Sequence, residues 1–238
     1  MSINESTEIL DEAIALEAGE NVRIDESLAA PVGQPAVDIS GDGARLTVSR
    51  DGELSAPDLG NSAVLNSGND VDIVNLGEIS GAFNGIVSVG NDFNLFNDSN
   101  ATISSDSRAL DVTDGDGISI INSGNILGTG DQRNGTLYVD GTGDDLDIIN
   151  NSSGVIDAGA GNIGDGLSVQ VGEENDLVSE GINIVNRGAI AGRGQAEFAA
   201  GEGRLAANGS SGVRFVNGAD ADQAVVTGSV ENLSLIHI

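Results

Sequence analysis

Apolar and polar residues alternate in short segments that recur along most of the chain. Clear examples are VDIVNLGEI (71–79), ISIINSGNI (118–126) and INIVNRGAI (182–190). In each segment an apolar–polar–apolar triplet and a further apolar residue precede Asn-x-Gly, and one more apolar position follows. A period of two is typical of a β-strand with one buried face. Each segment therefore predicts a strand, a turn at Asn-x-Gly and a second short strand.

Eight such units can be aligned on the apolar pair of the first of these strands. The pairs are Val22/Ile24, Leu46/Val48, Val71/Ile73, Phe93/Leu95, Ile118/Ile120, Leu146/Ile148, Ile182/Ile184 and Ala224/Val226. A preceding strand is predicted in most units, at Ile14/Leu16, Val37/Ile39, Val87/Val89, Leu110/Val112, Leu137/Val139, Leu167/Val169 and Val213/Phe215. A single apolar position follows each turn, at Leu28, Leu54, Ile79, Ile103, Ile126, Ile156, Ile190 and Val230.

Most units span 22–28 residues, and the last two are longer. Three short strands in a unit of this length predict an all-β fold, a single-stranded parallel β-helix of about eight coils that stack at about 4.8 Å. One coil cannot bury its apolar face alone, whereas several stacked coils can. Leucine-rich repeats have a similar period, but the chain lacks their helical half. Calcium-binding β-rolls have a shorter repeat.

The Asn of the repeat predicts a stacked row at one corner of the helix. It occupies the same aligned place in five units, at Asn75, Asn97, Asn122, Asn150 and Asn186, and Glu26, Arg50 and Gly228 take that place at the ends. Asn tolerates left-handed backbone geometry and bonds its own turn, and a Gly two residues later often adds a second permissive position. Amides stacked in line can also bond from coil to coil. We expect a structural ladder here, and a ligand site is the weaker alternative.

Acidic turns precede the second strand of several units, at SGDG (40–43), GND (68–70 and 90–92), DGDG (114–117) and GTGDD (141–145). Calcium binds six to eight oxygen ligands, which rows of carboxylates and carbonyls can supply. Candidate ligands are Asp70, Asp92, Asp114, Asp116, Asp144 and Asp145. Neither the calcium nonapeptide nor the EF-hand pattern is present. Ordinary turn chemistry explains the same residues, so weak collective calcium binding is the expectation rather than one tight site.

The charge of the chain limits its partners. The 238 residues carry 9 Lys+Arg, all of them Arg, against 38 Asp+Glu, for a formal charge of −29. Such a surface repels nucleic acid and anionic lipid, so neither is expected as a partner. Few aromatic residues and a high charge are typical of disorder, but the strong apolar pattern argues against it. There is no Cys, which excludes disulfides and thiolate chemistry.

The two ends differ from the repeat. Residues 1–13 predict a cap segment, with Ser6 or Thr7 starting a short helical turn, and residues 14–232 the repeat domain. The start is acidic and resembles no classical export signal, and no stretch has the length of a membrane span. Residues 233–238, LSLIHI, resemble a translated sequencing adapter. We expect a non-native tail there and a chain truncated near Asn232, so His237 is not used as a ligand.

A carbohydrate-active enzyme, a polysaccharide lyase or hydrolase, is the alternative function. Hydrolysis requires two carboxylates across the scissile bond, but the outward Asp72 and Asp147 are predicted to lie three coils apart. Asp111 and Tyr138 are predicted to be neighbours. Carboxylates clustered near the long late loops, around Asp157, Asp165 and Glu197, would favour the enzyme. We therefore predict no catalytic residue.

The pattern in VDIVNLGEISG (71–81), ISIINSGNILG (118–128) and INIVNRGAIAG (182–192) resembles the repeats of bacterial autotransporter passenger domains and large adhesins. The resemblance covers about residues 37–230 and implies a right-handed β-helix outside the cell. Autotransporters carry an export signal and a membrane barrel, and this chain shows neither. Its acidic start is more similar to secreted RTX-type proteins, whose export signal and calcium repeats lie at the C-terminus.

These observations predict an extracellular structural or adhesive module on the bacterial cell surface. It would be part of a longer polypeptide, would present loops on a rigid rod, and would be stabilised by calcium. The partner would be a glycan or protein of unknown identity, without direct membrane insertion. A stalk that binds no ligand is the third hypothesis.

Overall fold

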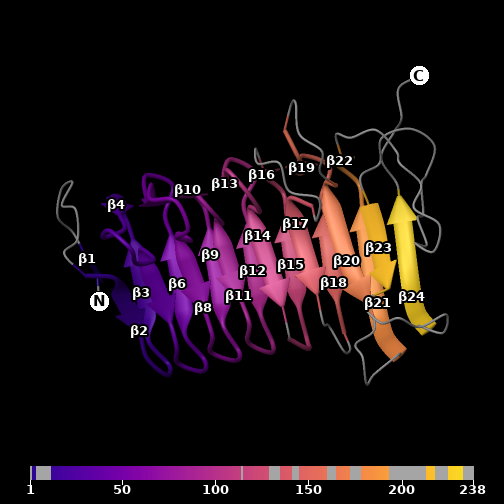
Figure 1. Cartoon of the computed structure of the whole chain (residues 1–238), viewed down its shortest axis with the longest axis horizontal. Coiled ribbons are helices and arrows are strands. Elements are labelled where there is room, and N and C mark those ends of the chain that lie inside the picture. Colours follow the sequence, from indigo (N-terminus) through magenta and orange to yellow (C-terminus); the bar gives the residue numbers. More distant parts are fainter. Residues whose placement is uncertain are drawn as a thin grey trace.

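The computed structural model describes residues 2–3, 12–113, 115–128, 135–140, 145–159, 165–171, 178–192, 213–217 and 225–232. Every regular element in these ranges is a β-strand, and all pairings are parallel. The strands form three sheets that run along the length of the molecule, and the coils stack one after another from the N-terminal end (Figure 1). The predicted parallel β-helix with three strands per coil is confirmed.

Each sheet takes one strand from each successive coil. The nine-stranded sheet contains β1 (Ser2–Ile3), β3 (Asn21–Ile24), β6 (Arg45–Val48), β9 (Asp72–Asn75), β12 (Asn94–Asn97), β15 (Ser119–Asn122), β18 (Asp147–Asn150), β21 (Val178–Asn186) and β24 (Val225–Asn232). The seven-stranded sheet contains β4 (Ser27–Ala29), β7 (Glu53–Ala56), β10 (Glu78–Gly81), β13 (Thr102–Ser105), β16 (Asn125–Gly128), β19 (Val155–Asp157) and β22 (Ala189–Ala191). The eight-stranded sheet contains β2 (Ile14–Leu16), β5 (Val37–Ile39), β8 (Val64–Asn66), β11 (Ile86–Ser88), β14 (Leu110–Thr113), β17 (Leu137–Asp140), β20 (Leu167–Val171) and β23 (Val213–Asn217).

The core is a set of apolar rows that run along the axis, one side chain per coil. The single apolar position after the Asn corner makes one such row and is buried throughout: Leu28, Leu54, Ile79, Ile103, Ile126, Ile156 and Ile190. Alternate residues of each strand face this core, so a strand with period-two patterning needs no partner outside the coil stack. The core prediction for this row is confirmed at these seven positions, whereas Val230, which was predicted for the row, pairs with Ile184 in the nine-stranded sheet.

The strand register corrects two parts of the sequence alignment. Leu46 pairs with Ile73 rather than with Val71, so Val48 and Ile24 occupy the place of the Asn row in the first coils. The predicted places, Glu26 and Arg50, were wrong. The alignment was displaced because the first coils carry an apolar residue, Ile24 or Val48, where the later coils carry Asn, so their apolar pair matches Ile73 and Asn75 instead of Val71 and Ile73.

The last coil is also shifted. Ile184 pairs with Val230, and Asn186 pairs with Asn232, so the prediction that Ala224/Val226 matches Ile182/Ile184 was wrong, as was Gly228 in the Asn row. A register irregularity between Ser179 and Ile182 in β21 accompanies this longer coil. Local apolar patterning cannot detect such a shift, because a displacement by an even number of residues preserves the alternation.

In the eight-stranded sheet, one strand was missed and one was misplaced, because each has a polar residue at an inward position. β8 places Val64 and Asn66 inward, and β11 places Ile86 and Ser88 inward, whereas Val89 is 41% exposed. The buried Asn66 donates from Nδ2 to Ser88 Oγ at 2.9 Å. This bond satisfies both side chains inside the core, where an unpaired polar group would cost about 1–3 kcal/mol.

The ends of the chain are described only in part. β1 pairs in parallel with β3 at the edge of the nine-stranded sheet. The predicted helical turn near Ser6 and the tail at 233–238 lie outside the described residues. Within the described ranges, no helical segment has the length and hydrophobicity that a membrane crossing requires.

Candidate functional site: two polar corners and a buried ion pair

The predicted Asn row forms a continuous hydrogen-bonded ladder inside the corner between the nine-stranded and seven-stranded sheets. Each Nδ2 donates to Oδ1 of the next Asn: Asn75 to Asn97 at 2.9 Å, then Asn97 to Asn122, Asn122 to Asn150 and Asn150 to Asn186, each at 2.8 Å. The first four residues are fully buried, and Asn186 is 7% exposed. The prediction of a structural ladder is confirmed.

The side-chain amide of each of the first four ladder residues also donates to a backbone carbonyl of the next coil. Asn75 donates to the carbonyl of Thr102, and Asn97 donates to that of Asn125, at 3.1 and 3.2 Å. These bonds connect the Asn ladder to the first residues of the strands in the seven-stranded sheet. Because the side-chain to side-chain bonds all cross from one coil to the next, the row fixes the register of stacking.

The physical reason given for Asn-x-Gly has to be corrected in part. Asn75 does bond its own turn, because its Oδ1 accepts from the backbone N–H of Gly77 at 3.2 Å. Residues with positive φ outside glycine are Asp70, Asp92 and Asp145 in the described chain, so no ladder Asn is left-handed. Gly124 is required for a different reason, because a Cβ there would collide with the carbonyl oxygens of Asp98 and Ala101. Asn is selected here for its paired donor and acceptor, and Gly for close approach of neighbouring coils.

The acidic corner lies before each strand of the nine-stranded sheet and forms a second ladder, this time exposed. Side-chain oxygens accept from backbone N–H groups of the next coil: Asp42 Oδ1 from Asn69, Asn69 Oδ1 from Asn91, and Asn91 Oδ1 from Asp116, at 2.8–3.0 Å. The residue that follows each of these four is left-handed: Gly43, Asp70, Asp92 and Gly117. The sequence signal was Gly, Asp or Asn placed directly before the apolar pair.

The candidate calcium ligands that the structure describes fall into this corner without converging. Asp70, Asp92 and Asp145 occupy exposed left-handed turn positions, and the exposed Asp116 belongs to the ladder. Asp114 and Asp144 lie outside the described residues. Among the residues that the structure places, no group of three or more His, Asp or Glu side chains is arranged to hold a metal ion.

A buried ion pair lies on the outer face of the eight-stranded sheet. Arg108 Nη1 donates to Asp111 Oδ2 at 2.8 Å, and the guanidinium lies 4.0 Å from the ring centroid of Tyr138. Asp111 and Tyr138 are direct cross-strand neighbours, as the sequence predicted. Asn84 Nδ2 also donates to Asp111 at 3.3 Å. The sequence analysis missed Arg108, although its place three residues before Asp111 was an available signal.

Chain segments that enter each strand cover these outward side chains. Asp111 and Tyr138 are 9% and 6% exposed although they point away from the core. Asn84 precedes β11 and covers Asp111 of the next coil. In the same way, Arg108 precedes β14 and covers Tyr138 of the next coil. Tyr138 donates in turn to Asp140 Oδ2 at 2.8 Å. The tyrosine ring is therefore enclosed and cannot serve as an open stacking platform.

Burial raises the pKa of Asp111 above its ordinary value of 3.8, and the Arg108 charge opposes this only in part. Its Oδ1 is buried without a hydrogen-bond partner. Burial and the hydrogen bond to Asp140 also raise the pKa of Tyr138. Desolvation disfavours the charged form of an acid, so the cluster holds a carboxylate that gains a proton more readily than an exposed one.

The other carboxylates considered for catalysis are separated. Asp72 and Asp147 lie in one outward row with Asn94 and Ser119 between them, as predicted. Asp157 accepts from the backbone N–H of Gly159 at 2.9 Å, which is local turn chemistry. Glu197 lies outside the described residues, so the predicted late-loop cluster is not described as a whole.

The fold and these sites define the chain as a parallel β-solenoid repeat protein. No protein-family model, no curated protein and no solved structure matches it.

Proposed function

We propose that the chain is a structural and adhesive module, a rigid β-solenoid within a larger secreted bacterial protein that presents its outer faces and loops to a partner on a surface. The observation that carries this proposal is the Asn ladder. A corner that is buried and bonded from coil to coil favours a stiff rod, because bending would break several bonds together. A rod of this kind supports a role in display at a distance.

The location of the module outside the cell is part of the same proposal. It is supported by the resemblance of the repeat to autotransporter passenger domains and adhesins, and by the charge of −29, which keeps a long rod soluble and separate from its copies. Antibody labelling of intact producing cells tests the location. Labelling only after the cells are permeabilised would contradict it.

Adhesion is tested with beads that carry the purified chain through one terminus. The beads are passed over immobilised matrix glycoproteins and cell-wall polysaccharides, and their retention under flow is counted. The control is an equally acidic globular protein on identical beads. The proposal predicts retention above this control on at least one surface. Equal retention on all surfaces, with the coated chain still folded, would contradict adhesion and leave a spacer.

Calcium enters the proposal as a screening cation at the acidic corner. The described Asp70, Asp92 and Asp145 supply one carboxylate per coil, whereas a single calcium ion takes six to eight oxygens. Melting curves in calcium, magnesium and sodium chloride at equal ionic strength test this. Both divalent ions should raise the melting temperature, because ions that bind only the folded state stabilise it. Equal melting in all three salts would remove divalent binding from the proposal.

A carbohydrate-active enzyme is the second candidate, and the Arg108–Asp111–Tyr138 cluster is the observation that favours it. Carboxylates with a raised pKa beside other polar groups are frequent at catalytic sites. Incubation with a panel of plant and bacterial polysaccharides, followed by assay of new chain ends, tests it. New ends that disappear in Asp111→Asn, with the variant still folded, would replace the scaffold proposal with the enzyme.

A further inference from the structure

An apolar row lies on the outside of the nine-stranded sheet, where water is the expected neighbour. Its members are in register on five successive strands: Val74, Phe96, Ile121, Ile149 and Val185. Phe96 is 37% exposed, Val185 is 9% exposed, and the other three are partly exposed. These are the residues directly before each ladder Asn, so the repeat itself specifies an apolar residue at this outer position.

A polar row runs beside the apolar row at the same spacing. It consists of the residues two positions earlier on each strand: Asp72, Asn94, Ser119, Asp147 and Asn183. Asn183 Nδ2 donates to Asp147 Oδ1 at 2.9 Å, so part of the row is already ordered. Carboxylate, amide and hydroxyl groups thus lie next to apolar side chains on every coil from β9 to β21.

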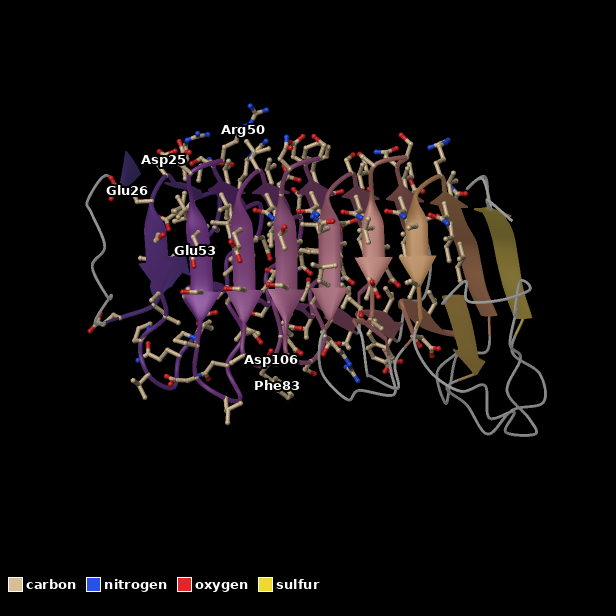
Figure 2. All side chains as sticks on the ribbon, turned by 90° about the horizontal axis from the view of Figure 1, so that it is seen from above. Asp25, Glu26, Arg50, Glu53, Phe83 and Asp106 are labelled. Carbon is tan, nitrogen blue, oxygen red and sulfur yellow. The ribbon has the colours of Figure 1, made fainter. Side chains whose placement is uncertain are left out.

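Strand propensity alone does not explain this outer apolar row. β-Branched residues are favoured in strands generally, but the matching outward row of the seven-stranded sheet is mixed in the corresponding coils: Ser80, Ser104, Leu127, Asp157 and Ala191. Figure 2 shows the polar residue Glu53 on a strand of that sheet, with Phe83 and Asp106 at the corner on one side of the sheet and Arg50 at the corner on the other. The outer apolar row therefore belongs to one face of the solenoid.

The width of the outer apolar row and the charge of the chain limit the class of ligand that can bind to this face. The apolar row is one side chain wide, whereas a stable protein interface buries about 800 Å² on each partner. A second copy of this chain would also meet a like charge of −29. An anionic polymer is repelled for the same reason. A narrow, linear and uncharged ligand fits better, with a repeat close to the strand spacing of about 4.8 Å.

We propose that this face binds an extended, neutral β-1,4-linked polysaccharide along the rod axis, with one sugar on each coil. One hexose in such a chain advances by nearly the same distance as one coil. The apolar C–H face of each ring would pack on the outer apolar row, and its hydroxyl groups would bond to the polar row. The inference rests on the proposed adhesive function and names its ligand class.

Binding is measured by titrating the whole chain with cello-oligosaccharides of two to six sugars. The affinity should rise with each sugar up to about four, because each sugar adds contacts on one further coil and Val185, on the fifth strand of the row, is only 9% exposed. Dextran, which has a different linkage and does not extend, and polygalacturonate, which is anionic, should bind more weakly than cellohexaose. An affinity that does not depend on oligomer length would overturn one sugar per coil without the use of any variant.

A matched pair of variants then places the site. Phe96→Ser combined with Ile121→Ser should weaken cellohexaose binding by roughly tenfold or more, the equivalent of about 1.4 kcal/mol. Leu127→Ser makes the same change at a partly exposed outward position of the seven-stranded sheet and should leave the affinity unchanged. Equal loss in both variants, with melting curves that match the parent chain, would overturn this placement.

The failure of this inference is distinguishable from failure of the proposed function. Retention of coated beads without binding of any cello-oligosaccharide would overturn the polysaccharide and leave the adhesive module standing. Sedimentation that shows concentration-dependent pairing, lost in the double variant, would instead assign the outer apolar row to self-association and overturn the inference.

Discussion

The Asn ladder and the acidic corner are both rows of Asn and Asp that repeat once per coil, yet they differ in what surrounds them. Asn97 and Asn122 are fully buried and bond to each other at 2.8 Å. Asn69 and Asn91 are exposed, and their side-chain oxygens accept from backbone N–H groups at the surface. Water can replace the bonds of the exposed row, but nothing can replace those of the buried row.

This contrast teaches that the residue type in a turn does not reveal its energetic weight. A buried polar group that loses its partner costs about 1–3 kcal/mol, whereas an exposed one transfers its bond to water. The Asn-x-Gly repeat is therefore a device for stacking coils. The residue type at the acidic corner can vary as long as it tolerates positive φ, because both Gly and Asp occupy the left-handed position there.

The largest difference between the two corners is expected from placing a charge in each of them. Asn122→Asp removes the donor to Asn150 and buries a carboxylate, and an uncompensated buried charge costs about 3–5 kcal/mol. Asn91→Asp makes the same change at the exposed corner and should alter the free energy of unfolding by about 0.5 kcal/mol or less. Denaturant unfolding of both variants measures this. Similar losses in the two variants would contradict the distinction between the corners.

A second pair of substitutions compares the glycines of the two corners. Gly124→Ala should cost about 1–3 kcal/mol, as overpacking does, because its Cβ would meet the carbonyl oxygens of two residues in the preceding coil. Gly43 has positive φ but open space around it, and Asp70 occupies the same position one coil later. Gly43→Asn should therefore change the melting temperature very little. A larger loss for Gly43→Asn than for Gly124→Ala would reverse our interpretation.

The smallest effect concerns the buried ion pair, which lies outside both corners. Because the pKa of Asp111 is raised, its contribution to stability is fully present below the ordinary pKa of 3.8 and is lost as the pH rises through the raised value. Asp111→Asn removes this dependence. The difference in melting temperature, parent chain minus variant, should therefore increase as the pH falls from 7 toward 4.

The sequence predicted the fold well because period-two alternation and a repeat of 22–28 residues are properties of the local chain. It predicted the Asn row for the same reason. It failed at Asn66 and Ser88, because polar residues that face the core are invisible to an apolar pattern until their coil-to-coil bond is known. It also failed at Glu26 and Arg50, because a two-residue shift preserves the alternation.

The candidate sites were predicted less well than the fold. The neighbouring places of Asp111 and Tyr138 followed from the repeat, but Arg108 lies in a turn whose direction the pattern does not specify. The described Asp70, Asp92 and Asp145 were correctly placed at one corner, but the left-handed backbone conformation that they adopt had been predicted for the Asn row. Turn geometry depends on contacts with the adjacent coil, which one sequence segment does not contain.

Hydrogen exchange of the side-chain amides tests the central claim most directly. NMR spectra of the labelled chain resolve the NH₂ groups of Asn97 and Asn122 in the ladder and of Asn69 and Asn91 at the acidic corner. The ladder amides should exchange slower by roughly two orders of magnitude or more, because exchange requires the buried coil to open. Equal exchange rates in the two rows would contradict the claim that the Asn-x-Gly repeat is the buried bond between coils.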